Sequence, residues 1–370
     1  MFRPPVLLLY FQAMILGIQY TAIPSAGNFL TSHFGFTGAE YSSLFIPMII
    51  MAVLSSFFGG ILAQHYSNKL LFLVGVVLNG VGLALVALMA LSPYIMLLVA
   101  MSFLGAGFGA TMTALNPLVV HYFCEKSDIA LTAMQACLGI GMALSPLLLN
   151  AAISLQIWWV DPLTLACINL VILLCGLALI PKSTTKGGTH ALFIPALVIF
   201  ALLAFLYGII ETTFGNWTTI YLYQERGFSL INANNALAIF WGSLIVGRIA
   251  ATLLMIKVSS QLIYRLLPLV ILVALGVMHF SNREFLAFAL AGLGCSALFP
   301  LTISFAQRRL PQIASFSSGV LIASNLMGYG TATSAGGLLH SVAAMSYQTI
   351  YLWLGLIVIV FGICAYIKER

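Results

Sequence analysis

Long apolar runs divide almost the whole chain, and this feature leaves few folds open to it. A transmembrane helix needs about 20 consecutive apolar residues, and twelve runs close to that length can be marked in the sequence. They span 6–30, 41–63, 70–90, 94–122, 128–154, 163–180, 191–223, 233–256, 261–279, 284–307, 313–339 and 347–366. Only 6% of the residues are charged, against roughly 25% in a soluble globular protein. The sequence therefore predicts an all-α polytopic membrane protein with twelve transmembrane helices.

A polar stretch, PKSTTKGGTH, separates the first six predicted helices from the last six. It predicts an N-terminal six-helix lobe over 1–180, a cytoplasmic linker over 181–190 and a C-terminal six-helix lobe over 191–370. The halves also share short matches in the same order; for example, GIQYT begins at Gly17 and GIIET begins at Gly208. Many secondary transporters are built from two such repeats, so we expect two pseudo-symmetric lobes.

The basic residues indicate the orientation in the membrane. An even number of helices places both termini on one side, and eleven of the fourteen lysines and arginines fall in the loops and ends of that side. These are Arg3, Lys69, Lys126, Lys182, Lys186, Lys257, Arg265, Arg308, Arg309, Lys368 and Arg370. Loops on the cytoplasmic side of a membrane carry an excess of lysine and arginine. We therefore expect both termini to lie in the cytoplasm, and we attribute the net charge of +6 to this orientation rather than to nucleic-acid binding.

The loop between the second and third predicted helices carries the sequence GILAQHYSNK, from Gly60 to Lys69. This sequence resembles the G-x-L-a-D-r-x-G-R-K motif of the major facilitator superfamily. Gly60 and Lys69 keep that pattern, whereas Gln64 stands at the acidic position. The resemblance implies the major facilitator fold, with Gly60, Gln64 and Lys69 as an inner-gate motif. Because Gln64 lacks the acidic charge of that motif, the resemblance does not determine the contacts of the gate.

A finer resemblance lies in the stretch E-x-x-x-G-N-W-x-x-x-Y that starts at Glu211 and is followed by Phe240-Trp241-Gly242 and Gly247-Arg248. It resembles bacterial members of the superfamily related to fucose permease. This implies a bacterial inner-membrane protein that carries out proton-coupled symport of a small polar, sugar-like solute by alternating access. Those permeases carry acidic residues in helices one and four, which are absent from these helices here. If protons are coupled, the task falls to helix seven.

Glu211 and Arg248 are the two charged residues placed well inside the expected hydrocarbon region. A lone charge there costs several kcal/mol and marks a candidate functional site. Glu211 lies 17 residues before the expected turn at Phe228 and Arg248 lies 20 residues after it, so their depths differ by only about 5 Å. We therefore expect a salt bridge. Two hypotheses stay open. The pair is either a permanent link between two helices or a switchable proton-coupling pair, in which protonation of Glu211 releases Arg248 or Arg248 instead binds an anionic substrate.

The superfamily resemblance implies a cavity lined by helices one, four, seven and ten, to which helices five and eleven add polar groups. Each amide could instead form a helix–helix hydrogen bond, and Trp217 could be an interfacial anchor, whereas Trp241 could stack on a sugar. The candidate substrate-binding residues are Gln19, Tyr20, Asn28, Asn116, Gln135, Asn216, Trp217, Trp241 and Asn325.

Two other functions remain as alternatives. The pattern Gly141-x-x-x-Ser145-Pro146 partly resembles an antiporter motif, which would suit a proton-antiport exporter of amphipathic drugs or metabolites. A receptor or scaffold without transport is the third possibility. The sequence contains no catalytic motif, no histidine spacing typical of a metal site and no phosphate-binding loop. We expect a monomeric membrane transporter that is not an enzyme, needs no cofactor or metal, and has a small-molecule substrate, protons and the lipid bilayer as its partners, with no nucleic acid.

Overall fold

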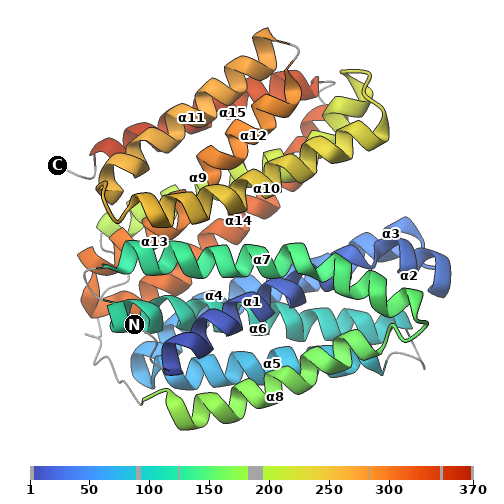
Figure 1. Ribbon diagram of the computed structural model, residues 1–370, viewed down its shortest axis with the longest axis vertical. Helices are drawn as coiled ribbons and strands as arrows, with labels where there is room; N and C mark the ends of the chain where they lie inside the picture. The colour runs from blue at the N-terminus through green and yellow to red at the C-terminus, as the bar shows by residue number, and fades with distance from the viewer. Residues whose placement is uncertain are drawn as a thin grey trace. The chain divides into compact units, whose positions relative to one another are not determined.

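The computed structural model describes residues 4–88, 93–123, 126–181, 195–281, 283–341 and 345–367, and these ranges are helical throughout apart from short connections (Figure 1). The helices of the first half are α1 (Pro4–Ser25), α2 (Gly27–Phe34), α3 (Gly38–Ser43), α4 (Phe45–His65), α5 (Asn68–Ala87), α6 (Pro93–Phe123), α7 (Ser127–Ser154) and α8 (Val160–Leu179). Those of the second half are α9 (Pro195–Gln224), α10 (Leu230–Leu254), α11 (Ser260–Phe280), α12 (Glu284–Cys295), α13 (Leu298–Arg309), α14 (Ala314–Ser341) and α15 (Tyr347–Ile367).

These helices confirm the predicted fold class. In the described part of the chain, eleven helical segments are long and apolar enough to cross a membrane, with α12 and α13 counted together as 284–309. The remaining predicted span, 313–339, corresponds to α14, which has 28 residues. At 1.5 Å per residue it is about 42 Å long and can also span a bilayer. Its serines, threonines and Asn325 make it more polar than the other spans.

Three of the predicted spans are interrupted. The first is divided at Ala26 between α1 and α2, the second at Leu44 between α3 and α4, and the tenth between α12 and α13. The interruption of the tenth span has a chemical cause, because Pro300 has no N–H to donate to the carbonyl of Ser296 four residues earlier. The helix therefore loosens at Ser296 and resumes at Leu298. The carbonyl of Ser296 is left available to another donor.

The chain forms two compact units. Unit 1 comprises Met1–Cys124, Met134–Leu192 and Gln307–Ala323, and unit 2 comprises Glu125–Ala133, Phe193–Ala306 and Ser324–Arg370. Most of each unit comes from one half of the chain, but 125–133 and 307–323 group with the unit that the other half dominates. The lobe boundaries at 180 and 191 therefore stay a prediction, and residues 182–190 of the linker lie outside the described ranges.

Two glycines bring α1 and α7 into backbone contact in unit 1 (Figure 1). A Cβ atom added to Gly17 would lie 2.0 Å from the carbonyl oxygen of Leu138, and one added to Gly141 would lie 1.9 Å from that of Met14. No side chain fits at such distances. Small residues of this kind allow membrane helices to approach closely, so α1 and α7 cross at a point that requires glycine on both.

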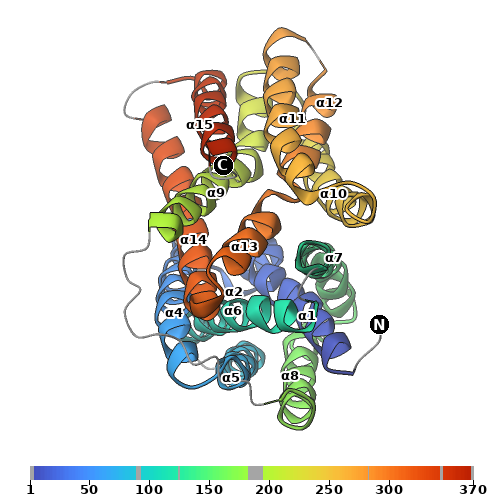
Figure 2. The same ribbon diagram turned by 90° about the vertical axis from the view of Figure 1, so that its left-hand side faces the viewer.

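The same crossing is found between α9 and α14 in unit 2 (Figure 2). A Cβ atom on Gly208 would lie 2.2 Å from the carbonyl oxygen of Asn325, and one on Gly328 would lie 2.1 Å from that of Phe205. In both units the contacted carbonyl lies three residues before the glycine of its own helix. This equivalence pairs α1 with α9 as the GIQYT and GIIET matches do, and it supports the predicted internal duplication.

Candidate functional site

The candidate site in unit 2 is centred on an ion pair between α9 and α10. Nη2 of Arg248 lies 3.7 Å from Oε1 of Glu211. The hydroxyl of Tyr207 donates a hydrogen bond of 2.9 Å to the same oxygen, since residues four apart lie on the same face of a helix. The side chains are nearly buried, with 15% of Glu211 and 6% of Arg248 exposed. The structure therefore brings together the two intramembrane charges, as the sequence led us to expect.

Arg248 is also held in position by the short connection between α12 and α13. Its Nε donates to the carbonyl oxygen of Ser296 at 3.2 Å, the carbonyl that Pro300 leaves without a helical donor. Gly247 makes this contact possible, because a Cβ atom there would lie 2.7 Å from Cβ of Ser296. The acceptor is neutral, so this hydrogen bond does not depend on the charge of Glu211. Arg248 can thus keep its place when the carboxylate takes up a proton.

The distance within the ion pair limits its strength. Charge-assisted hydrogen bonds between nitrogen and a carboxylate are usually about 2.7–2.9 Å long, whereas Nη2 of Arg248 and Oε1 of Glu211 are 3.7 Å apart. The two groups attract each other as charges without forming a bidentate pair. A loose pair of this kind can separate more readily than a tight one.

A polar row continues from this pair along α9 and α14 in unit 2. Nδ2 of Asn216 donates to Oγ1 of Thr333 at 2.8 Å, and the hydroxyl of Tyr329 lies 3.5 Å from Oδ1 of Asn216. The side-chain nitrogen of Asn325 is buried and has no hydrogen-bond acceptor among the described residues. Asn216 thus makes a helix–helix hydrogen bond in this structure, and Asn325 retains a donor for a further partner.

The two tryptophans of the set are both packed against glycines. Nε1 of Trp217 donates to the carbonyl oxygen of Ala332 at 3.2 Å, and an added Cβ atom on Gly336 would lie 2.4 Å from that nitrogen. The ring of Trp241 lies over Gly215, where an added Cβ atom would be 2.9 Å from Cζ2. These contacts position both rings, and a role in stacking on a solute stays a prediction for each.

In unit 1, two of the predicted residues have unsatisfied amide groups. Gln19 is 3% exposed, and neither its Nε2 nor its Oε1 has a hydrogen-bond partner in the described part of the chain. Asn116 donates to Oγ of Ser318 at 3.0 Å and to the carbonyl of Met112 at 3.1 Å. Its Oδ1 has no donor among the described residues. Buried amides without partners are costly, so both have capacity for a ligand or water.

Three other predicted substrate-binding residues lie in unit 1. The ring of Tyr20 packs on Phe108 with centroids 4.5 Å apart, and Gln135 is buried in α7. Asn28 belongs to α2, but its side chain lies outside what the structure describes. The proposed role of these three residues in substrate binding stays a prediction.

Two residues that the sequence analysis did not single out belong with these sites. Gln12 of α1 is fully buried, and both polar atoms of its side chain lack partners among the described residues. It lies seven residues before Gln19, about two helical turns, so the two amides share a face of α1. Tyr207 lies one turn before Glu211. In the sequence, Gln12 could have been found as an amide within an apolar run, and Tyr207 as a residue four positions before Glu211.

Residues of the 60–69 motif make packing contacts and a hydrogen bond between helices in unit 1. A Cβ atom on Gly60 would lie 3.1 Å from the carbonyl oxygen of Ser315, so α4 and the first part of α14 approach closely there. Nζ of Lys69 donates to the carbonyl of Leu177 at 2.7 Å, in the last turn of α8, where carbonyls lack helical partners. Nε2 of Gln64 is buried without an acceptor in the described ranges. Their inner-gate role stays a prediction.

The chemistry of the described residues includes no evident metal centre, since no three histidine, cysteine, aspartate or glutamate side chains gather there. The apolar helices and the buried ion pair define an integral, polytopic membrane protein. The family model described as Major Facilitator Superfamily matches residues 9–320. The chain belongs to the major facilitator superfamily and is a transporter of that fold.

Known relatives agree with this assignment. The chain is 25% identical to the "Glucose/mannose transporter GlcP" of Bacillus subtilis strain 168, over 85% of this chain and 84% of the relative. It also resembles a crystal structure of the major facilitator transporter FucP in the outward conformation, with a TM-score of 0.83, 18% identity and 99% of each chain covered. A crystal structure of a single-substitution variant of the E. coli fucose:proton symporter FucP has a TM-score of 0.81 at 18% identity, covering 99% of this chain and 98% of its own. The likeness to these structures establishes the shared fold.

Proposed function

We propose that this protein is a secondary active transporter that imports a sugar-like solute together with protons by alternating access. Membership of the major facilitator superfamily supports transport, and the glucose/mannose and fucose relatives support a sugar. The bacterial relatives support a bacterial inner membrane, and the distribution of basic residues supports cytoplasmic positions for both termini. In this proposal the two lobes, 1–180 and 191–370, rock about a midplane cavity, so that access to the cavity alternates between the two sides of the membrane.

Glu211 is the proposed proton site, and the observation that carries this role is its place between Arg248 and Tyr207. Uptake of a proton by Oε1 or Oε2 removes the charge that attracts Arg248. Arg248 then retains its hydrogen bond to the carbonyl of Ser296. When Glu211 takes up a proton, Arg248 therefore still has a hydrogen-bond acceptor. This acceptor reduces the cost of leaving the charge of Arg248 unpaired inside the membrane.

The unsatisfied amides support a hydroxylated solute. A sugar hydroxyl both donates and accepts hydrogen bonds, and an amide side chain supplies two donors and one acceptor oxygen. Gln12, Gln19 and Asn116 in unit 1 and Asn325 in unit 2 have such groups without partners in the described part of the chain. The proposed binding residues are these four with Tyr20, Asn28, Gln135, Asn216, Trp217 and Trp241.

The test is sugar uptake into proteoliposomes that contain the purified protein, with and without an inwardly directed proton gradient. Glucose, mannose and fucose are the solutes to compare. We expect the wild type to concentrate at least one of them only when the gradient is present. Glu211→Gln should lose concentrative uptake and keep exchange of labelled for unlabelled sugar, because only the coupling step needs a titratable group. Glu40→Gln, which alters a carboxylate of the short helix α3, is the matched control.

Three results would contradict parts of this proposal. Concentrative uptake that persists in Glu211→Gln would remove Glu211 from coupling. Uptake by the wild type that ignores the proton gradient would exclude proton symport. Gradient-driven extrusion of lipophilic cations, with no flux of any of the three sugars, would replace import by the exporter function.

A further inference from the structure

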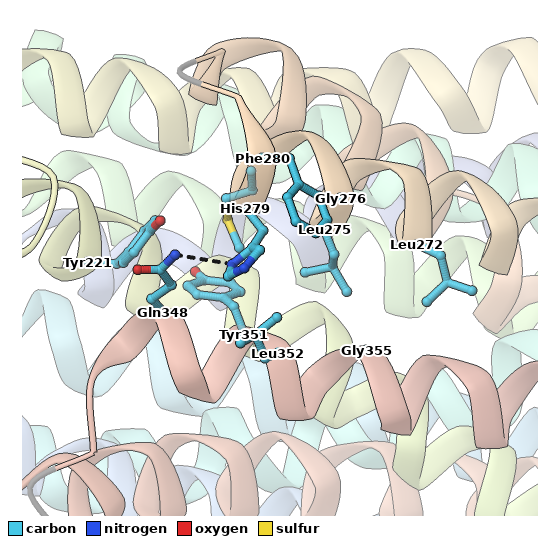
Figure 3. A pocket seen from close by; sticks show the side chains of 11 residues that line it. Tyr221, Leu272, Leu275, Gly276, His279, Phe280, Gln348, Tyr351, Leu352 and Gly355 are labelled. Carbon is cyan, nitrogen blue, oxygen red and sulfur yellow. Dashed lines mark hydrogen bonds between the residues drawn. The ribbon is translucent and has the colours of Figure 1, made fainter.

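A cavity of about 260 Å³ lies in unit 2 between α9, α11 and α15 (Figure 3). It has a polar end and an apolar end. Tyr221, His279 and Gln348 lie together at the polar end, whereas Leu272 and Gly355 lie at the other end (Figure 3). The cavity is separate from Glu211 and Arg248, which do not line it.

The polar end presents two hydrogen-bond donors. The hydroxyl of Tyr221 is buried and has no partner among the described residues, and the side chain as a whole is fully buried. Nε2 of Gln348 lies 3.1 Å from Nδ1 of His279. An amide nitrogen can only donate, so Nδ1 accepts, and the N–H of the ring is then at Nε2. Tyr351 does not add a donor, because its hydroxyl is directed to the carbonyl of Thr213 at 3.3 Å.

The apolar end is a groove formed where two glycines, Gly276 and Gly355, have no side chains. A Cβ atom on Gly276 of α11 would meet no described atom within 4 Å, and one on Gly355 of α15 would come within that distance of Leu275, at 3.6 Å. From Leu272 to His279 the groove follows α11 for seven residues, or about 10 Å. One leaflet contributes about 15 Å of hydrocarbon. The groove therefore covers about two thirds of that depth.

The groove faces lipid. Phe280 is 86% exposed and Leu352 is 50% exposed, on helices whose apolar faces must contact hydrocarbon in a membrane-spanning protein. The cavity is smaller than the roughly 300–1,000 Å³ that is usual for small-molecule sites. Its polar end lies at the ends of the three helices, where the chain reaches the membrane interface. A molecule that is polar at the interface and apolar toward the bilayer centre fits this gradient.

The charged groups near the polar end favour a neutral acceptor over an anion. The carboxylate of Glu225 accepts from the backbone N–H groups of Tyr347 and Gln348, and Arg226 forms an ion pair with Glu284. Among the described residues, no carboxylate, lysine or arginine lines the cavity itself. An ester carbonyl can accept from Tyr221 and His279 without bringing a charge close to Glu225.

We propose that this groove binds one acyl chain of a bilayer phospholipid, with the ester carbonyl of that chain on the hydroxyl of Tyr221 and on Nε2–H of His279. The chain lies along Gly276 and Gly355 toward the bilayer centre. In the orientation proposed above, the lipid belongs to the outer leaflet. The site does not depend on which solute the protein transports.

Native mass spectrometry of the full-length protein in detergent tests the site, with a lysophosphatidylcholine that has one ester-linked palmitoyl chain as the probe. We expect one lipid per protein molecule, and at least tenfold weaker binding of the ether-linked analogue, which lacks the carbonyl. Gly276→Leu should abolish binding by filling the groove. Gly242→Leu is the matched control, because Gly242 is an exposed helical glycine of α10 whose added Cβ meets no described atom within 4 Å.

Tyr221→Phe separates the two ends of the site. It should preserve binding of the chain but reduce the preference for the ester at least threefold, whereas Tyr223→Phe, which alters an exposed tyrosine outside the lining, should not. Gly355→Leu fills the groove from the facing helix and serves if Gly276→Leu does not fold. Equal lipid binding by the groove-filling variant and Gly242→Leu would overturn the proposal. An equal affinity for ester and ether lipids in the wild type, or displacement of the lipid by glucose, mannose or fucose, would also overturn it.

Discussion

The interaction between Glu211 and Arg248 can be measured by a double-mutant cycle with Glu211→Gln and Arg248→Met. At the observed separation of 3.7 Å, two unit charges attract each other by about 4 kcal/mol at an effective dielectric constant near 20. Removing one partner of a buried pair usually costs about 3–5 kcal/mol. We therefore expect Arg248→Met to lower the free energy of unfolding by about that amount, because the carboxylate is then left with the hydrogen bond from Tyr207.

The cycle isolates the charge interaction from the other contacts of Arg248. Arg248→Met also takes a donor from the carbonyl of Ser296, which costs about 1–3 kcal/mol. This loss is the same whether residue 211 is Glu or Gln, so it cancels from the coupling energy. We expect a coupling energy of about 3 kcal/mol, measured from the tryptophan fluorescence of the detergent-solubilised protein as sodium dodecyl sulfate is increased.

A coupling energy below about 0.5 kcal/mol would refute the inference that the pair stabilises the folded state. The same variants separate the two hypotheses for the pair when sugar uptake is measured. Concentrative uptake by the doubly substituted protein would mean that the pair is structural only. Its loss, with stability restored relative to Arg248→Met, would support a coupling role.

Two further substitutions test the geometry around the site. Gly208→Ala should prevent α9 and α14 from crossing and greatly reduce the yield of folded protein. The control Gly330→Ala, whose added Cβ meets no described atom within 4 Å, should change the free energy of unfolding by less than about 0.5 kcal/mol. Equal yields of the two variants in gel filtration would contradict this prediction. Pro300→Ala should supply an N–H to the carbonyl of Ser296 in competition with Arg248. Sugar uptake per folded molecule should then fall severalfold, and unchanged uptake would show that the freed carbonyl does not matter.

The sequence by itself determined the fold class, because the constraint is local. Each apolar run must satisfy its own backbone hydrogen bonds and match the bilayer thickness, so run length and composition identify the spans without knowledge of their neighbours. All twelve predicted spans correspond to helices in the structure. Glu211 and Arg248 stood out for the same reason, since a charge in an apolar run is visible in the sequence, and counting residues from one turn was enough to expect them at similar depth.

Tertiary structure alone decided the partners of these residues. Whether the carbonyl freed by Pro300 meets Arg248 depends on how closely α10 approaches α12, and Gly247 sets that distance only in the folded protein. The unsatisfied amide of Gln12 and the hydroxyl of Tyr221 became informative for the same reason. Hydropathy reports the depth of a residue in the membrane, but it does not report the rotation of one helix against another. That rotation determines which buried polar groups find partners and which remain open to a ligand.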